Sequence, residues 1–204
     1  MQFRSVAVAA CCLLALVACN DDGRTLEPAP EVPVSRETTS TSTGFDAGAT
    51  TESGAAAGLA LASTAFADGG FLDAEFTCEG TNVPPPLTIR GVPAAAAEVA
   101  IVVLDRDAEG FVHWVVTGID PAIGRLDGGA PPGAIAARTD SGVEGWDGPC
   151  PPRDDGPHDY VFTVYAAAEP IGLAAGLDGR DAIPLIEAAA VASDSITARY
   201  EAAS

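Results

Sequence analysis

The chain has 204 residues, with 29 acidic side chains against 10 basic ones and a formal net charge of −19 at pH 7. A chain this acidic repels phosphate backbones, which argues against nucleic-acid binding. Apolar residues make up 48% of the sequence but aromatic residues only 6%. We therefore expect one domain, with extra segments, whose core consists of small side chains around a few large ones.

The first 18 residues have the features of an export signal. Arg4 precedes an apolar run over residues 6–18, which is too short to span a bilayer at roughly 20 residues but suits a secretory signal. The run ends in LVAC, and Cys19 is followed by polar residues. This pattern resembles a bacterial lipobox and predicts cleavage before Cys19 and a lipid on its sulfur. The alternative is an ordinary signal peptide that contains cysteines.

Residues 19–57 are predicted to form a flexible tether between the lipid and a folded domain over residues 58–204. The segment is rich in proline, serine, threonine, glycine and acidic residues. Such a composition buries too little apolar surface to offset the entropy lost on ordering. The sequence thus predicts a bacterial cell-envelope lipoprotein, anchored to a membrane outside the cytoplasm.

The cysteines suggest one disulfide. Of the five, Cys11 and Cys12 leave with the signal and Cys19 carries the lipid, so Cys78 and Cys150 remain. Export permits disulfides, and an even number of remaining cysteines favours a bridge between these two. The alternative is a pair of free thiols buried as small hydrophobic groups.

Residues 58–204 are expected to form a mainly β domain with one late helix. In chain order, strands are predicted over residues 59–66, 87–89, 98–105, 113–120, 159–167 and 195–202, with an extended segment over 71–78. The run EVAIVVLD at 98–105 indicates a central strand buried on both faces. Asp181 and Pro184 mark the start of a helix that continues through 185–192. Short strands with Gly/Pro-rich connections favour a sandwich or a barrel.

Polar side chains stand at the ends of the predicted central strands: Asp105, Asp107, His113, His158 and Tyr160. Sites are commonly built at strand ends. Three interpretations are open: hydrogen-bonded structural histidines, a metal or catalytic site, or a pocket that binds an anion through histidine and tyrosine donors. The chain lacks H-x-x-x-H, C-x-x-C and G-x-S-x-G motifs, so we expect no metal, no cofactor and no catalytic nucleophile.

Three segments together resemble the phosphatidylethanolamine-binding protein family, also called Raf-kinase-inhibitor-like proteins, in its bacterial branch. They are LDRDAEGFVHWVVTGI, GWDGPCPPRDDGPHDYVFTVYA and STAFADGGFLDAEFTCEGTNVPPPLTIRGVP. The resemblance covers residues 59–202. It implies a β-sandwich of a large and a small antiparallel sheet with a C-terminal helix.

The same resemblance implies an anion pocket at one edge of the sandwich. The residues that match its lining are Asp105, His113, Gly148, Pro149, His158 and Tyr160. Glycine would let the ligand approach the backbone closely. Asp107 and Trp114 are expected to support the pocket rather than to line it. Pockets of this kind accept phosphate-like or carboxylate groups, including phospho-headgroups.

The resulting hypothesis is a membrane-tethered protein that binds a small anionic or zwitterionic ligand without catalysis. Inhibition of a partner protein is a further implication of the resemblance, although a kinase partner does not suit an exported protein. The alternative function is a hydrolase in which His113 or His158 acts as general base and Asp105 orients it.

Two acids depart from the family pattern. Asp147 stands where a glycine is usual, and Asp159 lies between His158 and Tyr160. Both are expected to weaken anion binding by repulsion, with Arg106 and Arg153 compensating. The sequence therefore favours a weakly charged or zwitterionic ligand over a free polyanion.

Overall fold

The computed structural model describes residues 58–203. The predicted signal, the lipidation site Cys19 and the tether over 19–57 lie outside the described residues. Within residues 58–203, no helix is long and apolar enough to cross a membrane.

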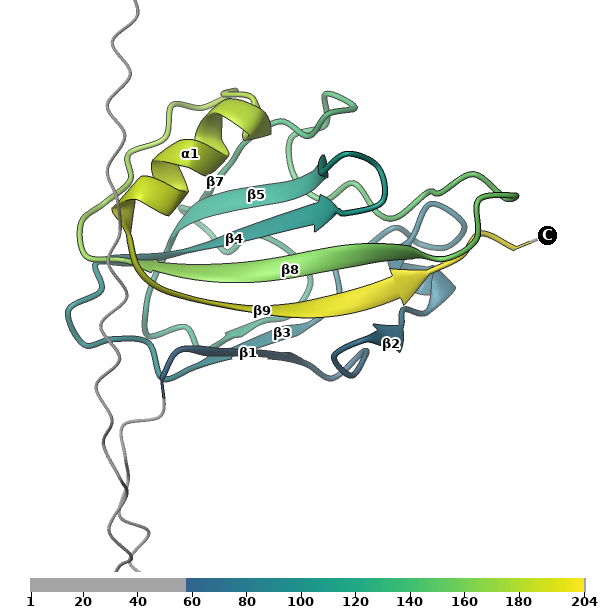
Figure 1. Ribbon diagram of the computed structural model, residues 1–204. Helices are drawn as coiled ribbons and strands as arrows, with labels where there is room; N and C mark the ends of the chain where they lie inside the picture. The colour runs from purple at the N-terminus through teal and green to yellow at the C-terminus, as the bar shows by residue number, and fades with distance from the viewer. Residues whose placement is uncertain (1–57, 204) are drawn as a thin grey trace, which may run out of the picture. The chain divides into compact units, whose positions relative to one another are not determined.

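Two sheets pack face to face as a sandwich, with one helix on the outer side of the larger sheet (Figure 1). The larger sheet has the strand order β2-β9-β8-β4-β5-β7, and the smaller has β1-β3-β6. Neighbouring strands are antiparallel except β2 and β9, which are parallel. This architecture confirms the predicted mainly β sandwich with a late helix.

The bounds of the elements are as follows. The larger sheet consists of β2 (Gly70–Phe71), β4 (Glu98–Asp105), β5 (Phe111–Ile119), β7 (Ile135–Ala136), β8 (His158–Ala167) and β9 (Ala190–Tyr200). The smaller sheet consists of β1 (Ala60–Ser63), β3 (Leu87–Arg90) and β6 (Arg125–Leu126). A 3₁₀ turn, η1, spans Ala74–Phe76, and the helix α1 spans Gly179–Ala189.

Strand β4 lies in the middle of the larger sheet and is covered on both faces. Val99, Ile101 and Val103 belong to the core between the sheets. Ala100 and Val102 belong to a second cluster on the other face, which α1 covers. Because neither face meets water, every position benefits from an apolar side chain, and the sequence shows a continuous run instead of alternation.

Several element boundaries differ from the predictions. Within the segment over 71–78, only Phe71 belongs to a strand, and the middle of the segment forms η1. The helix begins at Gly179 with Asp178 at the N-cap, so Asp181 lies in the first turn and Pro184 lies inside the helix.

The end of the helix also differs from the prediction. Residues 190–192 were expected to be helical but start β9, where Ala190 pairs with Ala167 and Ala192 with Ala166. Alanine-rich segments have little preference for strand on their own. Pairing with the neighbouring strand β8 therefore decides their conformation.

The disulfide is present. Cys78 and Cys150 are bridged, with their Cα atoms 5.5 Å apart and a separation of 72 positions in sequence. The bridge joins the loop after η1 to the proline-rich loop that precedes β8.

Candidate ligand-binding pocket

The inner face of the larger sheet ends in a polar row. Asp105, the last residue of β4, pairs with Tyr160 of β8, and His158 lies two residues before Tyr160 on the same face. One row further into the sandwich, Val103 pairs with Phe162 and both belong to the core. The polar row is therefore the continuation of the core face at the end of the sheet.

His113 reaches this row through a β-bulge. On β5, Val112 pairs with Leu104 and Trp114 pairs with Val103, so His113 is an extra residue without a partner on β4. A bulge re-aims the side chain at that position. As a result the His113 ring lies edge-on to Tyr160, with ring centroids 5.1 Å apart, although its neighbour Trp114 also belongs to the inner core.

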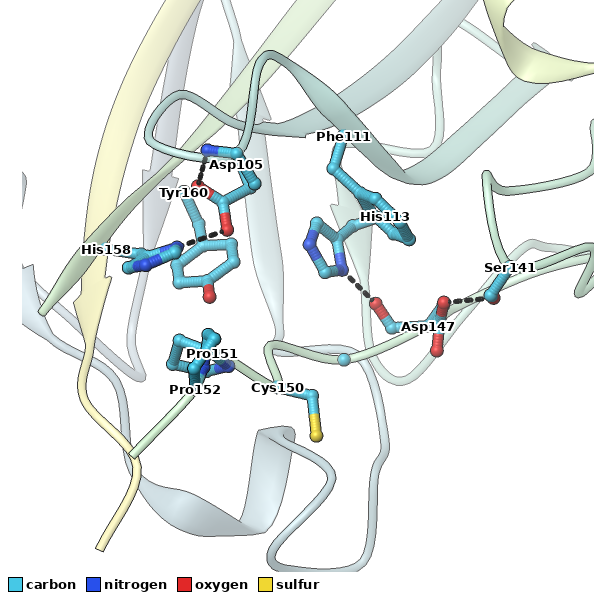
Figure 2. Close-up of a pocket in the computed structure, with 12 residues that line it drawn as sticks. Asp105, Phe111, His113, Ser141, Asp147, Cys150, Pro151, Pro152, His158 and Tyr160 are labelled. Carbon is cyan, nitrogen blue, oxygen red and sulfur yellow. Dashed lines mark hydrogen bonds and ion pairs between the residues drawn. The ribbon is translucent and has the colours of Figure 1, made fainter. Parts of the chain in front are cut away.

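These side chains line a cavity of about 280 Å³. Figure 2 shows its lining side chains between the strand ends and the loop that carries Cys150, Pro151 and Pro152. Its twelve lining residues are Asp105, Ala108, Phe111, His113, Ser141, Asp147, Gly148, Cys150, Pro151, Pro152, His158 and Tyr160.

The loop over residues 145–152 is fastened to the loop after η1. The indole N–H of Trp146 donates to the carbonyl oxygen of Phe76 at 3.2 Å. The backbone N–H of Cys78 donates to the carbonyl oxygen of Pro149 at 3.1 Å. Together with the disulfide, these bonds hold one wall of the cavity in place. Pro149 is buried in this contact and does not line the cavity.

Gly148 is required for a different reason from the one expected. A Cβ atom at this position would lie 2.2 Å from the amide oxygen of Asn82 and 2.6 Å from the carbonyl oxygen of Phe76. The backbone N–H of Gly148 donates to that same Asn82 oxygen at 2.9 Å. The glycine therefore allows two loops to approach each other, and its N–H is occupied by Asn82.

Asp105 orients His158. One oxygen of the Asp105 carboxylate accepts the backbone N–H groups of Asp107 and Ala108 at 2.9 and 3.1 Å. The other oxygen lies 2.7 Å from Nδ1 of His158, which is the donor because a carboxylate accepts. Burial lowers the pKa of His158, but the hydrogen bond and the charge of Asp105 outweigh it, so the pKa is raised. The pair favours a charged imidazolium.

His113 has the opposite electrostatic character. Its Nδ1 lies 2.6 Å from the backbone carbonyl oxygen of Asp147 and must carry the proton in that bond. Burial lowers the pKa of His113, and the bond to Asp147 offsets this only in part. Near neutral pH the ring is therefore uncharged, and its Nε2 is an acceptor.

The hydroxyl of Tyr160 has no hydrogen-bond partner within the part of the chain that the structure describes. The side chain is fully buried, and Figure 2 shows its oxygen directed into the cavity between the two histidines. Burial raises the pKa of Tyr160, and the negative charge of the nearby Asp105 carboxylate raises it further, so the hydroxyl remains protonated and can donate. A buried hydroxyl without a partner costs about 1–3 kcal/mol, which a ligand acceptor would recover.

Asp107 and Trp114 lie outside the lining, where they support the site. The Asp107 carboxylate accepts the backbone N–H of Asp159 at 2.6 Å and so fixes the start of β8. Trp114 is 1% exposed and packs edge-on against Trp146, with ring centroids 5.9 Å apart. Trp114 therefore supports the loop over residues 145–152 through its contact with Trp146.

The prediction that Asp159 lies beside the ligand and repels anions is wrong, because its side chain does not face the cavity. Asp159 does not line the cavity, because alternation along β8 turns its side chain to the opposite face from His158 and Tyr160. Its carboxylate pairs with Arg199 at 3.2 Å and with Arg106 at 3.5 Å. The charge of Asp159 is thus compensated away from the cavity.

The two arginines expected to assist the ligand are also engaged elsewhere. Arg106 pairs with Asp159, and Arg153 lies 3.5 Å from the carboxylate of Glu79. Neither lines the cavity. Asp147 is the one departure from the family pattern that does line it.

Sequence reasoning missed several lining residues. Phe111 stands two positions before His113 in the sequence, and its ring centroid lies 4.9 Å from that of the histidine. This spacing was a usable signal, because Phe111 opens the same strand. Ser141 lies in an irregular loop between β7 and β8, where no local pattern connects it with the strand ends.

Comparisons with known proteins agree with this architecture. The family model described as phosphatidylethanolamine-binding protein matches residues 62–201. The chain belongs to the phosphatidylethanolamine-binding protein family. A relative from Mycobacterium tuberculosis named "Putative lipoprotein LppC" is 43% identical over 156 residues, which cover 75% of this chain and 77% of the relative.

A solved member of the phosphatidylethanolamine-binding protein family has the same fold. The crystal structure of Escherichia coli YbcL, described as a new member of the mammalian family, matches with a TM-score of 0.68 and 31% identity. The match covers 72% of this chain and all of the YbcL chain. The sequence-based assignment to the family is therefore confirmed.

Proposed function

We propose that this phosphatidylethanolamine-binding family protein binds a small ligand that carries a phosphate or carboxylate group, such as a phospho-headgroup, without catalysing a reaction. The observation that carries the proposal is the buried Tyr160 hydroxyl, which is directed into the cavity without a partner among the described residues. Such a donor is satisfied when a ligand oxygen accepts its hydrogen bond. His158, held by Asp105, provides positive charge on the same side of the cavity.

A binding role also agrees with the state of the cavity serine. Hydrolases commonly activate a nucleophile through a hydrogen bond to a neighbouring base. The hydroxyl of Ser141 instead donates to the carboxylate of Asp147 and lies 2.9 Å from the hydroxyl oxygen of Thr139. Neither histidine is among its hydrogen-bond partners within residues 58–203.

A hydrolase is the second candidate, and the unprotonated Nε2 of His113 is the observation that favours it. A neutral imidazole at the edge of a cavity is the form that a general base requires. Turnover of phosphoesters or carboxylic esters, with or without added zinc, that disappears in His113→Ala would support this function over simple binding.

We further propose that the domain works outside the cytoplasm on a lipid anchor at Cys19. The lipobox-like sequence, the relative named as a lipoprotein and the disulfide between Cys78 and Cys150 support this location. Inhibition of a partner protein stays a prediction of the family resemblance.

Titration with ethyl phosphate and with inorganic phosphate tests the binding function. Trp146 is the natural reporter, because it is half-buried, precedes Asp147 in the loop and is bonded to Phe76. Its fluorescence should shift on binding, and His158→Ala should weaken the affinity by about tenfold or more, since charge-assisted hydrogen bonds contribute about 1.5–3 kcal/mol. Unchanged affinity in a folded His158→Ala protein would contradict the assignment of the pocket.

A further inference from the structure

The segment over residues 150–157 covers one side of the cavity but makes few bonds to the rest of the domain. Its first three residues line the cavity, and Figure 2 shows Pro151 and Pro152 where the oxygen of Tyr160 points. In the described part of the chain, the one backbone hydrogen bond of this segment lies inside the segment itself. Proline has no N–H to donate, so this sequence offers few bonds to neighbouring strands.

Side-chain contacts add little to this attachment. Arg153 lies 3.5 Å from Glu79, and Asp155 lies 3.7 Å from the imidazole of His158. The Arg153 and Asp155 side chains are 66% and 63% exposed, and ion pairs of exposed side chains contribute little to stability. Besides the packing of the buried Pro151, the disulfide at the start of the segment is therefore its main link to the rest of the domain.

The other half of the bridge, Cys78, belongs to a firmly held loop. Its neighbour Glu79 accepts the hydroxyl hydrogen of Tyr200 at 2.6 Å and the backbone N–H of Ala203 at 3.0 Å. On the other side of Cys78, Thr77 is fully buried. The bridge therefore joins a segment with few bonds to a fixed point at the end of β9.

Both cysteines of the bridge are exposed, so a dithiol can reach the sulfurs while the domain stays folded. In thiol–disulfide exchange, a thiolate of the reductant attacks one sulfur, the bond between the two cysteine sulfurs breaks, and a mixed disulfide forms. The second thiol of the reductant then displaces the protein sulfur. The reductant ends as a disulfide, while Cys78 and Cys150 take up two electrons and two protons and become thiols.

We infer that the bridge between Cys78 and Cys150 is a redox switch of ligand affinity, so that the oxidised protein binds its ligand more tightly than the reduced protein. This regulation rests on the proposed binding function and acts on the same site. When reduction frees the segment over residues 150–157, water reaches the hydroxyl of Tyr160, which is fully buried in the oxidised protein. The hydroxyl then bonds to water, and a ligand no longer meets an unpartnered donor in a dry site.

The test measures the binding of ethyl phosphate by calorimetry to the oxidised protein and to the protein treated with dithiothreitol. Reduction should weaken the affinity by about tenfold, which corresponds to a cavity wall that is in place in about one tenth of the reduced molecules. Reoxidation with a small disulfide should restore the affinity. Thiol labelling with mass spectrometry reports the state of Cys78 and Cys150, and circular dichroism reports whether the reduced protein is folded.

Two variants separate the bridge from the other contacts of the segment. The double substitution Cys78→Ser with Cys150→Ser should show the weak affinity of the reduced protein and no response to dithiothreitol. Arg153→Gln is the matched control, since it removes an exposed ion pair between the same two loops. This variant should keep the affinity of the oxidised protein within about twofold and keep the full response to reduction.

Equal affinities of the oxidised protein and the reduced, folded protein would overturn the inference and leave the binding function standing. A bridge that dithiothreitol does not reduce in the folded protein, or a protein that unfolds on reduction, would also overturn it, because the bridge would then serve stability alone. Failure of the oxidised protein to bind ethyl phosphate would overturn the proposed function and this inference with it.

Discussion

The middle and the end of the inner sheet face are built by the same strands but have opposite chemistry. In the middle, Val103 pairs with Phe162, whose ring contacts Phe66 and Trp146, with centroids 5.2 and 6.0 Å away. One row further along, Asp105 pairs with Tyr160, and a cavity lies above them. Pairing between β4 and β8 positions the apolar row of Val103 and Phe162 and the polar row of Asp105 and Tyr160 alike. The segments that cover each row therefore decide whether it is core or site.

The largest expected effect comes from breaking the apolar row. Phe162 is fully buried, and Phe162→Ala should reduce the free energy of unfolding by about 3–5 kcal/mol, through lost transfer energy and a cavity. Chemical denaturation followed by circular dichroism measures this. The control is Leu185→Ala on α1, where the side chain is 51% exposed and the change should stay within about 0.5 kcal/mol. Equal effects of the two substitutions would show that the assigned core is wrong.

The next largest effect is a difference between His158 and His113 in how their contributions to stability depend on pH. The pKa of His158 is raised above its ordinary 6.5 in the folded protein. Its contribution to stability is therefore complete below about pH 6.5 and is lost as the pH rises through the raised value. His158→Gln should destabilise the protein by about 1–3 kcal/mol at acid pH, and by less at alkaline pH.

His113→Gln should show the reverse trend. The folded pKa of His113 is lowered from 6.5, so its contribution is complete above about that pH and is lost as the pH falls. Unfolding titrations of both variants at about pH 5.5 and 8.5 check the two slopes. Parallel slopes for His158→Gln and His113→Gln would contradict the opposite protonation states assigned to the rings.

The smallest effect on stability is expected at Tyr160. Because its hydroxyl has no partner among the described residues, Tyr160→Phe should not destabilise the protein and should raise the free energy of unfolding by about 1 kcal/mol, the lower end of the cost of a buried hydroxyl without a partner. The same substitution should weaken phosphate binding by about tenfold, since it removes the donor on that side of the cavity. Thermal unfolding and ligand titration on one sample separate the two results. A large loss of stability would mean that the hydroxyl bonds within the protein.

Much of the fold was predictable because local patterns and tertiary environment agree. The continuous apolar run of β4 matched its bounds, and the alternation in β8 placed His158 and Tyr160 on one face. Asp105 followed from its position at the end of the buried strand. The start of α1 was not predictable in the same way, because Asp178 and Asp181 are both acceptable caps and only packing chooses between them.

The parts of the site that escaped prediction depend on contacts between distant segments. The unpaired position of His113 on β5 follows from its register with β4, which one strand alone does not specify. The neutralisation of Asp159 depends on Arg199, which lies opposite it on β9. The position of an acidic residue in the sequence does not show which basic residue will pair with it in the folded protein.

The sequence by itself determined the family, the sandwich class, the buried central strand and the set of polar residues at strand ends. Hydrophobic periodicity and short-range motifs encode these features, because burial of a strand face is a property of the strand. Only the tertiary structure decided that Gly148 serves a contact between loops, that Asp159 faces away, and that Asp147 lines the cavity beside Ser141. These depend on which loop covers the end of the sheet, and that is settled by packing and by the bridge between Cys78 and Cys150.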